Sequence, residues 1–146
     1  MTKLGTATIN GKSVSFFEPP HKDGPDFPWV DVKELAGAFL PPDAAIRMVE
    51  HAQRFGGDGE RVVTVTRNGD DIATIICHAL AQGLCGFIDQ QNGFAPADAD
   101  DAGPVHWQYC IAAGRFAADH WPLSFEGIIH AFHHGGGHFM QALRDE

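Results

Sequence analysis

Four of the nine histidines in this 146-residue chain lie within nine residues near its end, at positions 130, 133, 134 and 138. An imidazole nitrogen is the commonest metal ligand in proteins. If the segment after Ser124 is a helix, His130 and His134 are one turn apart, with Cβ atoms roughly 6 Å from each other, a spacing at which two imidazoles bind one divalent ion. His138 follows a glycine run and would supply a third ligand. These three histidines are a candidate site for a transition metal such as zinc or nickel.

The apolar residues of the same segment predict which way its histidines point. The apolar stripe consists of Phe125, Ile128, Ile129 and Phe132. On a helical wheel His130 and His134 lie opposite this stripe, so we expect them to face solvent or a partner. The simpler interpretation is an exposed helix end at which histidine complements the helix dipole. We favour that interpretation and keep metal binding as the alternative.

No other part of the sequence matches a catalytic signature. The chain has no nucleophile-elbow, zinc-protease or P-loop motif. Cys77, Cys85 and Cys110 are odd in number, lie in apolar surroundings and form no C-x-x-C pair, which is typical of reduced thiols in a core. We therefore expect a non-enzymatic regulatory or interaction module, with the metal-binding protein as the alternative and a small enzyme of unrecognised type as the third hypothesis.

Composition and charge narrow the class of protein. With 44% hydrophobic residues, 146 residues are enough for one core, so we expect a single domain over 1–146. The net charge is −9, of which residues 1–67 carry −1 and residues 68–146 carry −8. An acidic second half repels phosphate over roughly 8 Å, so the first half would have to make any contact with nucleic acid. No apolar run reaches membrane-spanning length, and the start has no signal-peptide core, so we expect a soluble, cytoplasmic protein.

Two β-hairpins are predicted from their turn dipeptides. Asn10-Gly11 and Asn68-Gly69 readily adopt the positive φ angles of a type I′ turn, and alternating apolar residues flank both. After the second turn, helical and strand spacing overlap over residues 72–76, and either structure remains open there. We prefer a strand to about residue 76 and a helix thereafter. In that helix, His78 and Gln82 are expected to lie on a polar face.

Helices are predicted from capping signals and apolar spacing. Asp31 and Glu34 resemble a capping box for a helix that ends at the two prolines 41 and 42. Asp43 would cap a second helix over 44–55. The polar face of this second helix contains Arg47, Glu50, His51 and Arg54.

A turn-rich acidic loop at about 92–103 precedes the next predicted helix, over 104–120. The apolar residues of this helix go nearly all the way round. We therefore expect either a central buried helix or one that also serves an oligomer contact. Aromatic surface near Trp107, Phe116 and Trp121 would favour a homodimer. The fold class that follows is α+β, with two hairpins forming a small antiparallel sheet packed with four or five helices.

Residues 27–84 carry a resemblance to a known family. The run from Pro28 to Val32 reads as an aromatic strand, and residues 31–36 read as the start of a D-V-x-x-L-A helix, followed by a second helix and a hairpin. This order resembles the amino-terminal domain shared by phage antirepressors and baculovirus Bro proteins. The resemblance implies an α+β fold and a regulatory role that extends to DNA binding in such domains. The chain departs from the family after residue 84, where an acidic linker stands in place of a basic segment.

The resemblance also gives a nucleic-acid hypothesis. The two helices around residues 40–43 could act as a helix-turn-helix whose second helix offers Arg47, His51 and Arg54 to DNA. Glu50 lies on the same face, and the positive stripe needed to bind phosphates is absent. Contact with nucleic acid is therefore the less favoured expectation.

Overall fold

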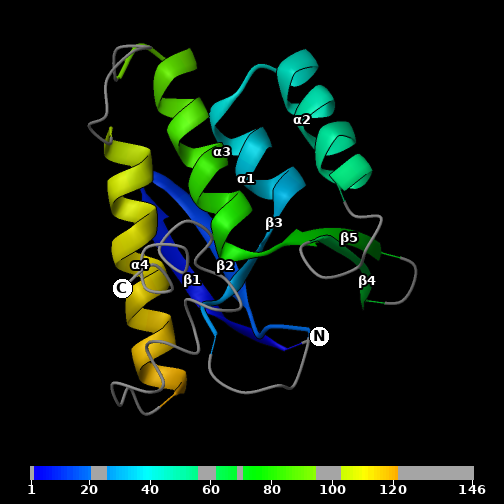
Figure 1. Ribbon diagram of the computed structural model, residues 1–146, viewed down its shortest axis with the longest axis vertical. Coiled ribbons are helices and arrows are strands. Elements are labelled where there is room, and N and C mark those ends of the chain that lie inside the picture. Colours follow the sequence, from blue (N-terminus) through cyan, green and yellow to red (C-terminus); the bar gives the residue numbers. More distant parts are fainter. Residues whose placement is uncertain (1, 21–25, 56–61, 69–70, 95–102, 122–146) are drawn as a thin grey trace, which may run out of the picture.

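The computed structural model describes residues 2–20, 26–55, 62–68, 71–94 and 103–121 (Figure 1). In chain order its elements are β1 (Lys3–Ile9), β2 (Lys12–Phe17), β3 (Trp29–Asp31), α1 (Val32–Phe39), α2 (Pro42–Phe55), β4 (Val62–Asn68), β5 (Asp71–Ile76), α3 (His78–Gln91) and α4 (Pro104–His120). The fold is α+β, as the sequence predicts. Four helices lie in the described residues, and the fifth expected helix, after Ser124, lies outside them.

One antiparallel sheet runs in the order β1-β2-β3-β5-β4. The hairpins do not pair with each other directly, because the short strand β3 lies between them. Phe17 of β2 pairs with Trp29, and Ile76 of β5 pairs with Val30. In the first turn, Asn10 has φ 45° and Gly11 has φ 84°, the positive values that a type I′ turn requires. The prediction of a hairpin there is confirmed.

The ambiguity at residues 72–76 is settled in favour of a strand. β5 pairs with β4 over its whole length and ends at Ile76, and α3 begins at His78. Ile75 and Ile76 are both buried, although successive strand residues point to opposite faces of the sheet. Because buried residues lie on both faces of β5, its apolar positions also fit the spacing of a helix.

Helix α1 begins where the capping signal places it. The Asp31 carboxylate accepts hydrogen bonds from the backbone amides of Lys33, at 2.9 Å, and Glu34, at 3.4 Å. The Glu34 carboxylate accepts hydrogen bonds from the amide and the hydroxyl of Ser15, and so connects α1 to β2. Helix α2 begins at Pro42, two residues before the predicted start, because proline suits the first turn of a helix.

The main core lies between the sheet and helices α1, α3 and α4. Its largest fully buried side chains include Phe16, Leu35, Ile88 and Tyr109. A second, smaller cluster on the opposite face of the sheet contains Trp29 and other buried residues of β2 and β5. No helix in the described part of the chain has both the length and the apolar character needed to cross a bilayer.

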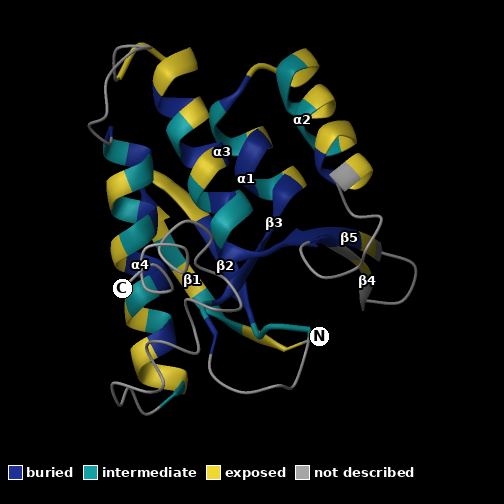
Figure 2. Cartoon of the chain, in the orientation of Figure 1, coloured by how far each residue is buried: buried dark blue, intermediate teal, exposed yellow. Residues whose placement is uncertain are grey.

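Helix α4 lies at one side of the molecule, against α3 and β1 (Figure 1). Its outer side is largely exposed (Figure 2), and Trp107 and Ile111 are 62% and 39% exposed. Of the two alternatives expected for this helix, the central buried position was wrong, and a role in an oligomer contact stays a prediction. The helix has apolar residues all round because it packs against two neighbours and also presents apolar side chains to solvent.

Candidate functional site

The three predicted nucleic-acid residues lie together on the outer face of α2. Arg47, His51 and Arg54 are exposed and one turn apart, as the helical wheel predicts. Asp43 and Glu50 are exposed on the same side of the helix. The two arginines and the two carboxylates cancel, so this face has no net formal charge.

Helix α2 packs mainly on α1 and leaves an open groove toward β5, which we call the α2–β5 groove. Its volume is about 650 Å³. Its lining residues are Asp31, Lys33, Gly37, Leu40, Pro42, Ala45, Ile46, Val49, Glu50, Gln53, Ile72, Ala73 and Thr74. Ile46 of α2 is 58% exposed and Ile72 of β5 is 65% exposed. Two large aliphatic side chains from different elements are therefore exposed to solvent along one groove.

On its other side α2 borders a second hollow, the α2–α3 groove, of about 330 Å³. Nearly all of its lining is apolar: Val32, Met48, His51, Ala52, Ile76, Ala79, Leu80, Gly83, Leu84 and Phe87. Phe87 is 39% exposed. His51 thus belongs to the rim of an apolar groove as well as to the charged face of α2.

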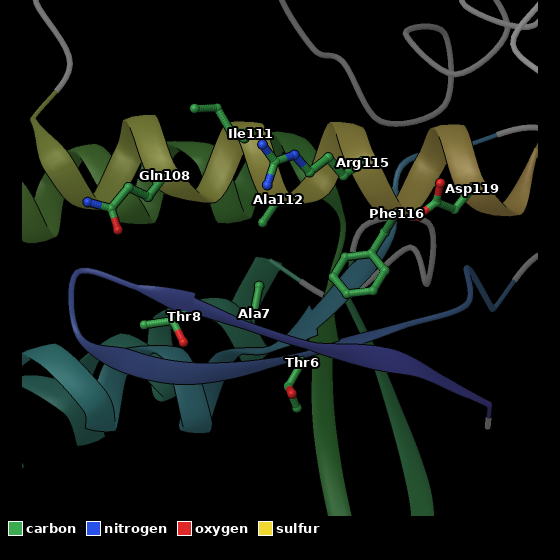
Figure 3. A pocket seen from close by; sticks show the side chains of 9 residues that line it. All are labelled: Thr6, Ala7, Thr8, Gln108, Ile111, Ala112, Arg115, Phe116 and Asp119. Atoms are coloured by element: carbon green, nitrogen blue, oxygen red, sulfur yellow. The ribbon is translucent and has the colours of Figure 1, made fainter.

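A third hollow lies between strand β1 and helix α4 (Figure 3). Its volume is about 560 Å³, and its lining is Thr6, Ala7, Thr8, Gln108, Ile111, Ala112, Arg115, Phe116 and Asp119. Ala7 points toward α4, whereas Thr6 points away from it. Arg115 and Asp119, one turn apart, carry opposite charges. We call this feature the β1–α4 hollow; no sequence signal singled it out, because it depends on where α4 crosses the sheet.

The most unusual polar group of the interior is His78, which was expected on an exposed polar face. That prediction was wrong: His78 is buried, its Nδ1 shares a 2.8 Å hydrogen bond with the Tyr109 hydroxyl, and its ring stacks on Phe27 with centroids 4.2 Å apart. Burial lowers the pKa of His78 to about 4, with a smaller contribution from nearby His106, so the ring is neutral at pH 7. Burial also raises the pKa of Tyr109 well above its usual value. This pair is a structural core contact.

A second buried polar group fixes α4. The Asp89 carboxylate, on α3, accepts hydrogen bonds from the amides of Val105, at 3.0 Å, and His106, at 2.9 Å. These amides lie in the first turn of α4, where a helix lacks internal acceptors. The residue before the helix, Gly103, has no side chain to serve as a cap, and a Cβ there would lie 2.4 Å from the Asp89 side chain. Asp89 therefore has a structural role as a cap from a neighbouring helix.

Cys77 and Cys85 are buried and Cys110 is half-buried, and none of the three is in a disulfide. Burial raises the pKa of both Cys85 and Cys110, which disfavours the thiolate that a nucleophile or metal ligand requires. Within the described ranges, no three His, Cys, Asp or Glu side chains are grouped to hold a metal ion. The histidines at 130, 134 and 138 lie outside the described residues, and their metal site stays a prediction.

Comparison with known proteins gives no match. No protein-family model matches the chain, and no curated protein or solved structure is significantly similar to it.

Proposed function

We propose that this protein is a non-enzymatic regulatory or interaction module and that it binds another protein along α2. The observation that carries this proposal is the pair of exposed isoleucines, Ile46 and Ile72, along the α2–β5 groove. Large apolar side chains that line a shared groove and remain in water are typical of a binding surface. The second groove, beside Phe87, adds apolar surface on the other side of the same helix.

The charges around α2 favour a protein partner over nucleic acid. A duplex needs a positive surface, because the release of counterions from phosphates supplies much of the binding energy. Arg47 and Arg54 share their face with Asp43 and Glu50, so that requirement is not met. An amphipathic protein segment suits this surface better, with apolar side chains in the grooves and mixed charges toward the outer face of the helix.

The chemistry of the described interior favours a binding module over an enzyme. His78 and Asp89 have hydrogen-bond partners within the fold. The raised pKa of Cys85 and Cys110 keeps these thiols protonated at neutral pH. A catalytic group needs access to a cleft and a pKa shifted toward its reactive form. The pKa of the two thiols is shifted away from the reactive thiolate, and His78 and Asp89 have structural roles.

The experiment is site-specific photo-cross-linking in the producing cells from a photoreactive residue at Ile46, with the same residue at Ile111 as the matched control. A protein captured only from Ile46 is then purified, and its affinity is measured by calorimetry for wild type, Ile46→Lys and Ile111→Lys. We expect Ile46→Lys to weaken binding at least about tenfold, equivalent to about 1.4 kcal/mol, and Ile111→Lys to bind like wild type. Equal binding by all three chains would exclude the α2 surface.

The nucleic-acid hypothesis is tested by retention on duplex DNA at low salt. The proposal predicts that wild type is not retained. Retention that is lost in the double variant Arg47→Ala, Arg54→Ala would replace the proposed protein partner with DNA.

The proposal also includes self-association, and metal binding is kept as the alternative function. The protein is expected to form a homodimer, since Trp107 of α4 is largely exposed, although Phe116 and Trp121 are only partly so. Metal binding through His130, His134 and His138 is the alternative function, and elemental analysis of untagged protein tests it.

A further inference from the structure

Strand β1 is an edge of the sheet, and the direction of its backbone groups follows from the turn. Ile9 and Lys12 flank the two-residue turn and therefore form a hydrogen-bonded pair. Hydrogen-bonded and non-bonded pairs alternate, so Ala7 bonds to β2, while the N–H and C=O groups of Thr6 and Thr8 point outward. In the described part of the chain no strand pairs with this outer edge.

The open stretch is short and has little protection against pairing. Edge strands are commonly protected by lysine, proline or a bulge. In β1 these features occur only at the start, where Lys3 is exposed and the register shifts at Leu4. Thr6 to Thr8 carries none of them, and these residues form one wall of the β1–α4 hollow.

Two contacts fix how α4 runs relative to β1. A Cβ on Gly5 would lie 2.9 Å from the Phe116 ring, and the amide of Asn10 donates a 2.6 Å hydrogen bond to the side chain of Gln108. The strand therefore runs antiparallel to the helix, and Ala7 lies across from the region of Ala112. Both alanines line the hollow (Figure 3).

From this geometry we propose that the β1–α4 hollow is the homodimer interface, in which β1 pairs antiparallel with β1 of a second copy about a twofold axis at Ala7. Thr6 of each copy then pairs with Thr8 of the other, and their outward N–H and C=O groups form reciprocal hydrogen bonds. The two sheets become continuous across the axis. This inference rests on the proposed self-association and names the surface that mediates it.

The same twofold axis also brings the exposed sides of the two α4 helices together. An axis at Ala7 passes α4 near Ala112, so the two α4 helices lie antiparallel on one side of the joined sheet. Ile111, 39% exposed in one chain, lies beside the axis and contacts its own copy. Gln108 of one chain lies opposite Arg115 of the other. One axis therefore satisfies both the strand edge and the exposed side of the helix.

A second copy fits this hollow better than a separate extended peptide. A peptide would satisfy the outward groups of Thr6 and Thr8 but would leave the exposed side of α4 uncovered. The second copy supplies a strand edge and a helix together. The ionised side chains of the lining, Arg115 and Asp119, cancel, so two chains of net charge −9 can meet here without repulsion between the facing surfaces.

The test is sedimentation equilibrium of the untagged, reduced chain at about 10 and about 100 μM, both above a dissociation constant of about 1 μM. Two variants target the interface. Ile111→Lys places a charge beside the axis, and Thr6→Pro removes one outward N–H while leaving the ladder with β2 intact. Ile46→Lys is the matched control, because Ile46 is exposed on a different face. Circular dichroism verifies that each variant is folded.

We expect wild type and Ile46→Lys to have twice the 15.8 kDa mass of the chain. Ile111→Lys and Thr6→Pro should raise the dissociation constant at least about tenfold. A monomeric wild type at both concentrations would overturn the self-association and this interface together. A wild-type dimer that both interface variants leave unchanged, or that only Ile46→Lys weakens, would overturn this interface alone.

Discussion

Because His78 is buried, we expect the protein to lose stability in mild acid. Burial lowers the pKa of His78 to about 4, from 6.5 in an unfolded chain. Above pH 6.5 the ring is neutral in both states, and stability does not depend on its titration. Between pH 6.5 and about 4 the unfolded chain binds a proton at this site that the native chain does not, so stability falls as the pH falls. The full difference, reached below about pH 4, is about 3 kcal/mol.

The assay is urea unfolding at pH values from 7.5 to 4 for wild type, His78→Gln and the exposed-histidine control His51→Gln. His78→Gln removes the titrating group, so the wild-type advantage over this variant should shrink by about 3 kcal/mol between pH 7 and pH 4. His51→Gln, at an exposed position, should change the stability at pH 7 little. If the difference between wild type and His78→Gln stays constant across this range, the account of a neutral, buried ring is wrong.

If His78→Gln does not fold, Tyr109→Phe provides a second test of the buried His78–Tyr109 pair. It keeps the ring stacking but leaves the Nδ1 atom of His78 without its 2.8 Å partner. The expected loss at pH 7 is about 1–3 kcal/mol, the cost of a buried polar atom without a hydrogen bond. The acid dependence should remain, because burial is the larger cause of the lowered pKa.

Three further predictions concern other groups. Asp89→Ala should destabilise the protein by about 3 kcal/mol in urea unfolding, because two amides at the start of α4 lose their acceptor; the exposed-residue control Glu50→Ala should change stability little. Gly103→Ala should destabilise it as well, since a Cβ 2.4 Å from the Asp89 side chain forces a displacement, and a melting temperature equal to that of wild type would contradict that contact. Elemental analysis of untagged protein, purified without added metal, should find no stoichiometric zinc, nickel or iron; about one ion per chain that is lost in His130→Ala, His134→Ala would instead support the metal-binding alternative.

Local signals in the sequence predicted most of the elements. The positive φ angles at Asn10 and Gly11, and the helix start at Asp31, follow from residues only a few positions apart. Residues 72–76 could not be decided by spacing alone, because the apolar residues at 72, 73, 75 and 76 fit both a strand and a helix. Its pairing with β4 decides it, and that partner comes from another segment.

Contacts between distant residues were the part that the sequence did not predict. His78 was placed on a polar face because its partner, Tyr109, is 31 residues away in the chain. The cap of α4 was missed for the same reason, since Asp89 lies on another helix. At the candidate site, the wheel correctly placed Arg47 and its neighbours on the outside of α2. The grooves on either side of that helix depend on tertiary packing, and no periodic pattern indicates them.

The claim that the open edge of this fold is a contact surface between two copies is tested most directly by backbone amide hydrogen exchange at β1, followed by NMR. The amide of Ala7 bonds within the chain and should be protected at every concentration. The amides of Thr6 and Thr8 should be protected only where the dimer forms, and should exchange freely on dilution and in Ile111→Lys. Rapid exchange at Thr6 and Thr8 in concentrated wild-type protein would contradict the account.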